Sequence, residues 1–188
     1  MRVISGEYRG RRLKALEGKN TRPTTDKVKE SIFNIIGPYF QGGCSLDLFA
    51  GSGALTIEAL SRGIEKAVCV DHHPGAIKII KENLSLVRAQ EAATVLKMEA
   101  NQALERLKQE GWRFDLVLFD PPYAKQDIVS QMEKMVQYQL LNEDCCVVCE
   151  TDKQVALPDE VPGFQLRRRA TYGMTEVVVY YYVGERND

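Results

Sequence analysis

Four consecutive residues in the second half of the chain, Asp120-Pro121-Pro122-Tyr123, combine a carboxylate, two prolines and an aromatic ring. Each proline fixes its own φ, restricts the residue before it and removes an N–H donor, so the segment offers mainly hydrogen-bond acceptors. The Asp120 carboxylate and the Pro121 carbonyl could hold the hydrogens of an exocyclic amine on a nucleobase and turn its lone pair toward a methyl donor. Tyr123 could stack on that base, a contact worth about 1–3 kcal/mol. The alternative is a rigid turn without a chemical role.

A glycine loop, Asp47-Leu48-Phe49-Ala50-Gly51-Ser52-Gly53, lies at the end of an apolar run. Its glycines let the backbone approach a ligand without a Cβ in the way. Asp71 closes the next apolar run about 20 residues after Gly51, an offset at which an acid can bind a ribose hydroxyl pair. The alternative is that Asp47 and Asp71 only cap or turn the chain.

The loop is compatible with two ligand classes. A dinucleotide site would have a third glycine where this chain has Thr56, and the Asp47 carboxylate would repel a pyrophosphate. The same carboxylate would attract an ammonium group. S-adenosylmethionine carries an ammonium, a sulfonium and a ribose, so the loop favours this cofactor over a nicotinamide dinucleotide.

The elements that must position these residues alternate along the chain. Helical periodicity over residues 26–36, which Thr24 or Thr25 can cap, precedes five apolar runs separated by helical patterns. These runs predict strands at residues 44–49, 66–70, 93–98, 114–119 and 145–150. Residues 164–171 and 175–183 then predict a hairpin. The expected fold is α/β: a mostly parallel seven-stranded sheet with an antiparallel C-terminal hairpin and helices on both faces. The loop, Asp71 and the tetrad would meet at the carboxyl ends of the strands.

Charge is unevenly distributed. The whole chain has a net charge of −1, yet residues 1–30 hold nine basic and four acidic groups. A basic segment on an acidic body favours a polyanion-binding surface, although a solvated tail would look the same. Residues 1–22 are therefore predicted to form a basic arm or hairpin, followed by a single domain over residues 23–188.

Length and composition narrow the class of protein. A chain of 188 residues suits one domain, and no apolar run approaches the roughly 20 residues of a membrane helix. The N-terminus lacks a secretory pattern, so the expected location is the cytoplasm. Five cysteines, mostly within or beside strand-like runs, are expected to be buried core thiols rather than disulfides or metal ligands.

Longer stretches of sequence resemble a known family. The glycine loop and the Asp120–Tyr123 tetrad resemble the class I methyltransferases that act on amino groups, which have a Rossmann-like fold. Residues Arg22 to Asn34, Gly6 to Arg11, Ala59 to Gly63 and Tyr172-Gly173 resemble the RsmD family of bacterial rRNA methyltransferases. The resemblance spans nearly the whole chain. It implies methyl transfer from S-adenosylmethionine to guanine N2 in 16S ribosomal RNA. The RNA is expected within a small-subunit or assembly particle, and no metal is expected.

The resemblance also assigns three groups of residues. The cofactor would contact Asp47, Phe49, Ala50, Gly51, Gly53 and Asp71, with Glu99 or Asn101 near its adenine. The guanine amine would be held by Asp120, Pro121, Pro122 and Tyr123. The RNA would be bound by Arg9, Arg11, Arg12, Arg22 and Thr24, the arginines contacting phosphates.

Three other functions stay open from the sequence. A DNA or RNA enzyme that methylates adenine N6 or cytosine N4 would present an amine to the same tetrad, although a specific DNA enzyme usually carries a larger recognition domain. A nicotinamide-dependent oxidoreductase would leave the tetrad unexplained. A non-catalytic RNA-binding factor would have no need of Asp120 or of the intact glycine loop.

Overall fold

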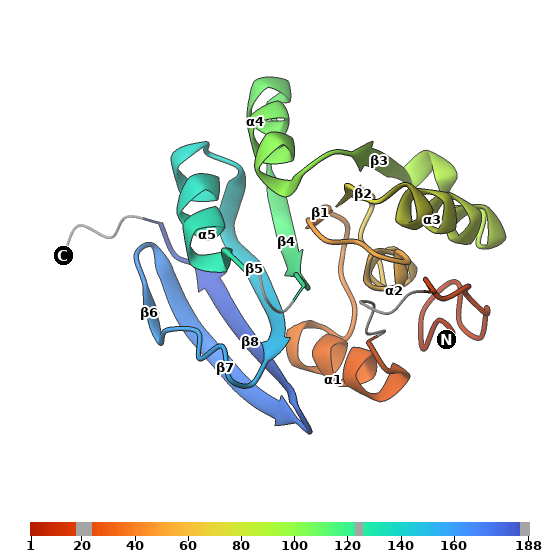
Figure 1. Cartoon of the computed structure of the whole chain (residues 1–188), viewed down its shortest axis with the longest axis horizontal. Helices are drawn as coiled ribbons and strands as arrows, with labels where there is room; N and C mark the ends of the chain where they lie inside the picture. The colour runs from red at the N-terminus through yellow and green to blue at the C-terminus, as the bar shows by residue number, and fades with distance from the viewer. Residues whose placement is uncertain (18–23, 123–125, 185–188) are drawn as a thin grey trace.

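The computed structural model describes residues 1–17, 24–122 and 126–184. Its strands form a sheet in the order β3-β2-β1-β4-β5-β8-β7-β6 (Figure 1). Five strands run parallel: β1 (Cys44–Asp47), β2 (Lys66–Asp71), β3 (Ala93–Lys97), β4 (Phe114–Phe119) and β5 (Leu141–Asp152). Three antiparallel strands complete it: β6 (Glu160–Val161), β7 (Phe164–Tyr172) and β8 (Thr175–Tyr182). The mostly parallel α/β fold with a C-terminal hairpin is confirmed.

The expected number of seven strands is wrong, because the described sheet has eight. The additional strand, β6, has two residues and pairs with the start of β7 at the edge of the sheet. Two residues are too few to show an alternating pattern, so only the pairing reveals the strand. Strand β5 is also longer than expected, because it begins at Leu141 rather than at Cys145.

Helices cover both faces of the sheet (Figure 1). One face packs against α4 (Ala100–Glu110) and α5 (Ile128–Gln137), and the other against α1 (Asp26–Ile36), α2 (Ala54–Ser61) and α3 (Pro74–Leu86). A short 3₁₀ helix, Gln90–Ala92, precedes β3. Successive residues of β4 alternate between the two cores: Val117 faces the α4 and α5 side, whereas Leu116 and Leu118 face the other. This two-sided burial accounts for the nearly continuous apolar sequence of β4.

The helix starts follow local sequence. Thr25 caps α1, because its side chain accepts a hydrogen bond from the Val28 N–H at 3.2 Å. His73 caps α3 through Nδ1, which accepts from the N–H groups of Gly75 and Ala76. The sequence had suggested no role for this histidine. The cap fixes the start of α3 at Pro74, three residues after Asp71 ends β2.

Residues 1–13 fold back on themselves and pack against the body. Arg2 and Arg12 form an antiparallel bridge, and the Leu13 N–H donates to the Met1 carbonyl. Val3 and Leu13 are buried in the same core as α1, α2 and α3. The basic segment is therefore anchored by apolar side chains, while Arg9, Arg11 and Arg12 remain exposed.

Four of the five cysteines are buried and the fifth, Cys44, is half-buried. All five are free thiols. Cys146 and Cys149 face opposite cores of the sheet, so this C-x-x-C pair cannot converge on one ligand. In the described ranges, no helix combines the length and the apolarity needed to cross a lipid bilayer.

Candidate active site

The sheet order reverses between β1 and β4, which lie side by side although β2 and β3 separate them in sequence. In such sheets the loops that follow the two strands diverge and leave a crevice at the carboxyl ends. The glycine loop follows β1, Asp71 ends β2, and Asp120 follows β4. The fold thus brings three segments that are far apart in sequence to one edge of the sheet.

The glycine loop needs glycine at two positions. Gly51 has φ +57° and Gly53 has φ +82°, conformations that L side chains rarely adopt. Within the described residues, a Cβ on Gly51 would meet no heavy atom within 4 Å, so the loop is open to a ligand there. The Ala50 N–H donates to the Val70 carbonyl at 2.9 Å and ties the loop to β2.

Asp71 joins the glycine loop to the start of α3. Its Oδ2 accepts from the Gly51 N–H at 3.0 Å, and its Oδ1 accepts from the His73 N–H at 2.9 Å. These bonds fix the carboxylate at the carboxyl end of β2. Each carboxylate oxygen can accept more than one hydrogen bond, so the side chain keeps the capacity to bind ribose hydroxyls.

Asp47 is the most buried carboxyl group at this edge, with 1% of its surface exposed. Burial raises its pKa to about 7, against the opposing effects of the Thr56 hydroxyl and the Phe49 backbone. Thr56 donates to Oδ2 at 2.9 Å. In the described parts of the chain, no group makes a hydrogen bond of standard geometry to Oδ1. A buried acceptor without a donor fits a site for an ammonium group, either directly or through water.

Thr56 has a role that the sequence did not suggest. The position was notable only as the missing third glycine of a dinucleotide motif. In the structure its side chain is buried and holds Asp47 beneath the glycine loop. A glycine there could not make this hydrogen bond, so the substitution that weakens the dinucleotide interpretation also orients the proposed ammonium ligand.

The tetrad begins immediately after β4. Asp120 is half-buried, Pro121 is buried and Pro122 is exposed, whereas Tyr123 lies outside the described residues. Thr24 Oγ1 lies 3.5 Å from Asp120 Oδ2 and donates to Glu150 Oε2 at 2.8 Å. One threonine hydroxyl therefore connects the chain ahead of α1 with the ends of β4 and β5.

Glu150 was not selected from the sequence. It lies near the end of β5, is 8% exposed and accepts the Thr24 hydrogen bond. The available signal was its place in the predicted strand 145–150, since neighbouring parallel strands end at the same edge of a sheet. Thr24 itself is buried among carboxylates rather than exposed beside the arginines.

Two residues near the end of β3 were expected beside the adenine. Glu99 precedes α4, is exposed and, in the described structure, makes no side-chain capping bond. Asn101 is also exposed, and its Oδ1 accepts from Gln131 Nε2 at 3.3 Å. The Met98 N–H donates to the Asp71 carbonyl at 3.1 Å, which brings this turn beside the end of β2. Both side chains remain candidates.

Three of the four arginines predicted to bind RNA lie among the described residues. Arg9, Arg11 and Arg12 are exposed, and Arg11 Nη1 makes one long hydrogen bond of 3.4 Å to the Leu86 carbonyl. Arg22, the fourth predicted RNA contact, lies outside the described residues. The guanidinium groups are thus carried by a folded segment rather than by a free tail.

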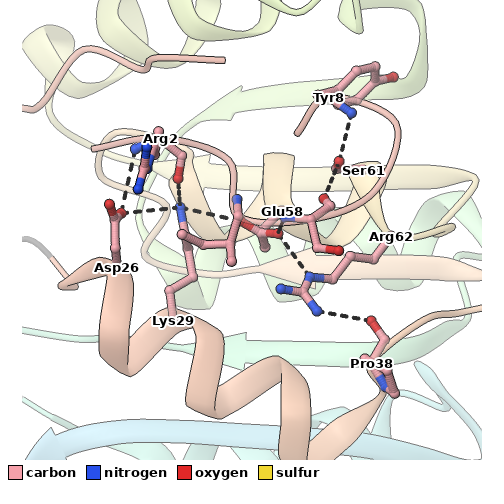
Figure 2. Close-up of polar contacts among 10 residues, drawn as sticks. Arg2, Tyr8, Asp26, Lys29, Pro38, Glu58, Ser61 and Arg62 are labelled. Atoms are coloured by element: carbon pink, nitrogen blue, oxygen red, sulfur yellow. Dashed lines mark hydrogen bonds and ion pairs between the residues drawn. The ribbon is translucent and has the colours of Figure 1, made fainter. Parts of the chain in front are cut away.

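A buried ionic cluster anchors that segment. Figure 2 shows Glu58 of α2 between Lys29 of α1 and Arg62. Glu58 Oε1 lies 3.4 Å from Lys29 Nζ, and Oε2 accepts from Arg62 Nε at 2.8 Å. The same carboxylate accepts from the N–H groups of Ile4 and Ser5 at 2.9 and 3.2 Å. The cluster therefore joins the N-terminal segment to two helices.

Lys29 shows how closely the cluster is enclosed. Its side chain is 0% exposed and donates to the Arg2 carbonyl at 2.6 Å. Burial lowers the pKa of Lys29, while the Glu58 carboxylate acts in the opposite direction. On the other side, Ser61 Oγ accepts from the Tyr8 N–H at 2.9 Å (Figure 2). Sequence reasoning did not detect this cluster, because its charges looked like ordinary solvated positions.

Comparisons with known proteins agree with this architecture. Bacillus subtilis YlbH, whose name assigns it provisionally to the rRNA methyltransferases, is 48% identical over 180 residues, which cover 96% of this chain and 98% of YlbH. The ribosomal RNA small subunit methyltransferase D of Haemophilus influenzae is 32% identical over 183 residues, covering 96% of this chain and 93% of that protein. The solved structure of Escherichia coli yhhF, provisionally described as a methyltransferase, matches with a TM-score of 0.85 at 26% identity and covers 98% and 99% of the two chains.

These similarities extend over the N-terminal segment, the sheet and the C-terminal hairpin together. One family model matches residues 1–181, a range that includes both the basic segment and the glycine loop. The chain therefore belongs to the family described as Conserved hypothetical protein 95, and the resemblance to the RsmD family is confirmed.

Proposed function

We propose that this protein transfers a methyl group from S-adenosylmethionine to the exocyclic N2 amine of a guanine in 16S ribosomal RNA. Family membership and the names of the relatives support an rRNA methyltransferase. The observation that carries the chemistry is that Asp120 follows β4 and the glycine loop follows β1, two neighbouring parallel strands at the point where the strand order reverses. A target amine at Asp120 and a cofactor at the loop would then lie next to each other.

The cofactor site is proposed to consist of the loop and the acids around it. Asp47 would receive the ammonium group, because its Oδ1 is buried and accepts no hydrogen bond of standard geometry in the described structure. The open space above Gly51 would admit the methionine part, together with Phe49, Ala50 and Gly53. Asp71 would bind the ribose, and Glu99 or Asn101 the adenine. When bound, the cofactor supplies an electrophilic methyl group on a sulfonium.

The chain's own residues would prepare the nucleophile. The amine nitrogen of guanine is a weak nucleophile because its lone pair is delocalised into the ring. The Asp120 carboxylate and the Pro121 carbonyl would accept hydrogen bonds from the two N–H groups of the amine and orient its lone pair toward the methyl group. The nitrogen must lose one proton when it gains the methyl group, and the Asp120 carboxylate would accept that proton. Positioning at near-attack distance supplies much of the remaining acceleration.

RNA binding is assigned to the N-terminal segment. Arg9, Arg11 and Arg12, with Arg22, would contact phosphates and hold the RNA without reading its sequence. The guanine would have to leave its stack or lie in an exposed loop to reach Asp120. Tyr123 would then stack on it. The substrate is proposed to be RNA within a small-subunit or assembly particle in the cytoplasm.

Methyl transfer tests the proposal directly. Small-subunit particles from cells that lack the enzyme are incubated with S-adenosylmethionine labelled in its methyl group, and digested nucleosides are then separated. Label in N2-methylguanosine supports the proposal. Label in N6-methyladenosine or N4-methylcytidine would instead identify the related amino-methyltransferase activity, and absence of label in RNA would overturn the proposal.

The role of Asp120 is tested by Asp120→Asn. The amide retains the shape but loses the charge and the capacity to take a proton, so kcat is expected to fall by about 10²–10⁴-fold. Affinity for S-adenosylhomocysteine should stay within about threefold of wild type. Asp127→Asn is the matched control, because Asp127 is exposed and its side chain does not cap α5 in the described structure. Full activity of Asp120→Asn would contradict the assigned role.

A further inference from the structure

A buried asparagine lies between the N-terminal segment and the glycine loop. Asn83 is on α3 and has 0% of its surface exposed. Its Nδ2 donates to the Lys14 carbonyl at 2.9 Å and to the Ser52 carbonyl at 2.8 Å. Its Oδ1 accepts from the Lys14 N–H at 2.8 Å. One amide side chain thus joins both backbone groups of Lys14 to the centre of the glycine loop.

The arrangement uses the hydrogen-bonding capacity of the amide almost fully. An asparagine side chain has two N–H bonds to donate, and both are used here. The contact with Lys14 resembles one residue pair of a β-ladder, because the Asn83 side chain donates to the Lys14 carbonyl and accepts from the Lys14 N–H. Ile80, one turn before Asn83, lies close to the same loop: a Cβ added to Gly53 would come within 3.5 Å of its side chain. Helix α3 therefore lies directly against the loop and is bonded to it through Asn83.

Lys14 lies on the path from the basic surface to the active site. The fold of residues 1–13 that carries Arg9, Arg11 and Arg12 ends immediately before it. Ten residues further along the chain, Thr24 donates to Glu150 beside Asp120. Beyond the anchors of residues 1–13 at Glu58 and Ser61, the chain that leads toward Asp120 is therefore held at Lys14 and at Thr24. The first of these, through Asn83, is shared with the proposed cofactor loop.

We propose that Asn83 is a positioning residue that couples the two substrates of this enzyme, so that cofactor binding at the glycine loop and RNA binding at the N-terminal segment strengthen each other. The inference rests on the proposed function, since it requires an RNA ligand for the basic segment. A cofactor that orders residues 51–53 also orders Asn83, which in turn holds Lys14. RNA that holds the N-terminal segment acts through the same hydrogen bonds in the reverse direction, as thermodynamic linkage demands.

The test is a binding cycle with S-adenosylhomocysteine, which cannot donate a methyl group, and unmethylated small-subunit particles. The affinity for particles is measured with and without saturating S-adenosylhomocysteine, for wild type and for Asn83→Leu. Leucine has a similar size and removes all three hydrogen bonds. Wild type should bind particles about fivefold or more tightly with S-adenosylhomocysteine, and the ratio should fall below about twofold in Asn83→Leu. The affinity for S-adenosylhomocysteine should change by the same ratios when particles are added.

Lys14→Ala is the matched control. The hydrogen bonds between Asn83 and Lys14 use backbone atoms of Lys14, so this variant loses the exposed ion pair with Glu82 but keeps the three hydrogen bonds of Asn83. Its affinity ratio should equal that of wild type, even if its overall RNA affinity falls. A ratio near one in Lys14→Ala, or a wild-type ratio in Asn83→Leu, would overturn the inference.

A measurement on the wild-type protein tests the coupling even if Asn83→Leu does not fold. Amide hydrogen exchange is followed with and without S-adenosylhomocysteine. The Lys14 N–H, which donates to Asn83, should exchange more slowly with the ligand, whereas the Gly10 N–H, which donates to Val3 within the N-terminal fold, should not change. Unchanged exchange at Lys14 would refute the coupling. If wild type methylates RNA but shows no coupling, only this inference fails; if it does not methylate RNA, the proposed function fails with it.

Discussion

Replacing Glu58 by glutamine is expected to destabilise the protein strongly. The carboxylate is fully buried between Lys29 and Arg62, and it also accepts two backbone N–H groups of the N-terminal segment. Glutamine has nearly the same size but no charge. Its NH₂ group would face donors, and the two cations would lose their shared counter-ion. The loss should therefore come from electrostatics and unmatched donors rather than from packing.

The size of the effect follows from burial. Breaking a buried ion pair by removing one partner typically costs about 3–5 kcal/mol, because an uncompensated charge stays inside the protein. Lys29 is 0% exposed and the Arg62 side chain 2%, so water can reach neither charge easily. For a chain of this length each kcal/mol lowers Tm by roughly 2–4 °C, so Glu58→Gln should lower Tm by about 10 °C.

Urea unfolding followed by circular dichroism measures the loss. Glu30→Gln is the matched control, because Glu30 is the exposed neighbour of Lys29 on α1, and its substitution should change stability by less than about 0.5 kcal/mol. Adding Lys29→Met to Glu58→Gln removes one of the two buried cations that have lost the Glu58 carboxylate. The double variant should recover about 1–3 kcal/mol relative to Glu58→Gln. A loss below about 1 kcal/mol in Glu58→Gln, or no recovery in the double variant, would refute the reasoning.

Two further predictions concern the cofactor and the RNA. Burial raises the pKa of Asp47 to about 7 in the folded state. Between pH 4 and 7 the folded protein therefore keeps a proton on Asp47, whereas the unfolded chain has already released it. The contribution of Asp47 to the free energy of unfolding falls as the pH rises through this range. An ammonium ligand needs the ionised form, so calorimetric affinity for S-adenosylhomocysteine should rise between pH 5.5 and 7.5 in wild type but stay flat in Asp47→Asn; equal pH profiles would disprove the ammonium contact. Changing Arg9 and Arg11 to glutamate should weaken RNA binding at least tenfold and reduce its dependence on salt, without altering cofactor affinity. RNA binding is measured by filter binding and cofactor binding by calorimetry without RNA, where coupling between the two ligands cannot act. A loss of cofactor affinity under that condition would contradict separate binding sites on segment and loop.

Much of the fold was determined locally, and the sequence therefore predicted it. The alternation of apolar strands with helical patterns led to five parallel strands and a terminal hairpin, because short connections and the ends of strands leave clear marks in the sequence. The positions of the glycine loop, Asp71 and Asp120 at one edge followed from the same pattern. Their chemical roles remain predictions.

Other features depended on residues that meet only after folding. Glu150 reaches Thr24 across 126 positions of sequence separation, and Asn83 reaches Lys14 across 69. Lys29 and Glu58 look like ordinary surface charges until α1 and α2 enclose them. The strand β6 exists only because β7 offers it a partner.

The sequence by itself determined the residue types and spacings from which the proposed chemistry is argued: an acid followed by two prolines, and a glycine loop with its neighbouring acids. The tertiary structure alone decided how the basic segment is held against that site. The physical reason is burial. A carboxylate or an amide becomes a strong anchor only where water is excluded and its partners are fixed, and a linear pattern of residues does not record where that happens.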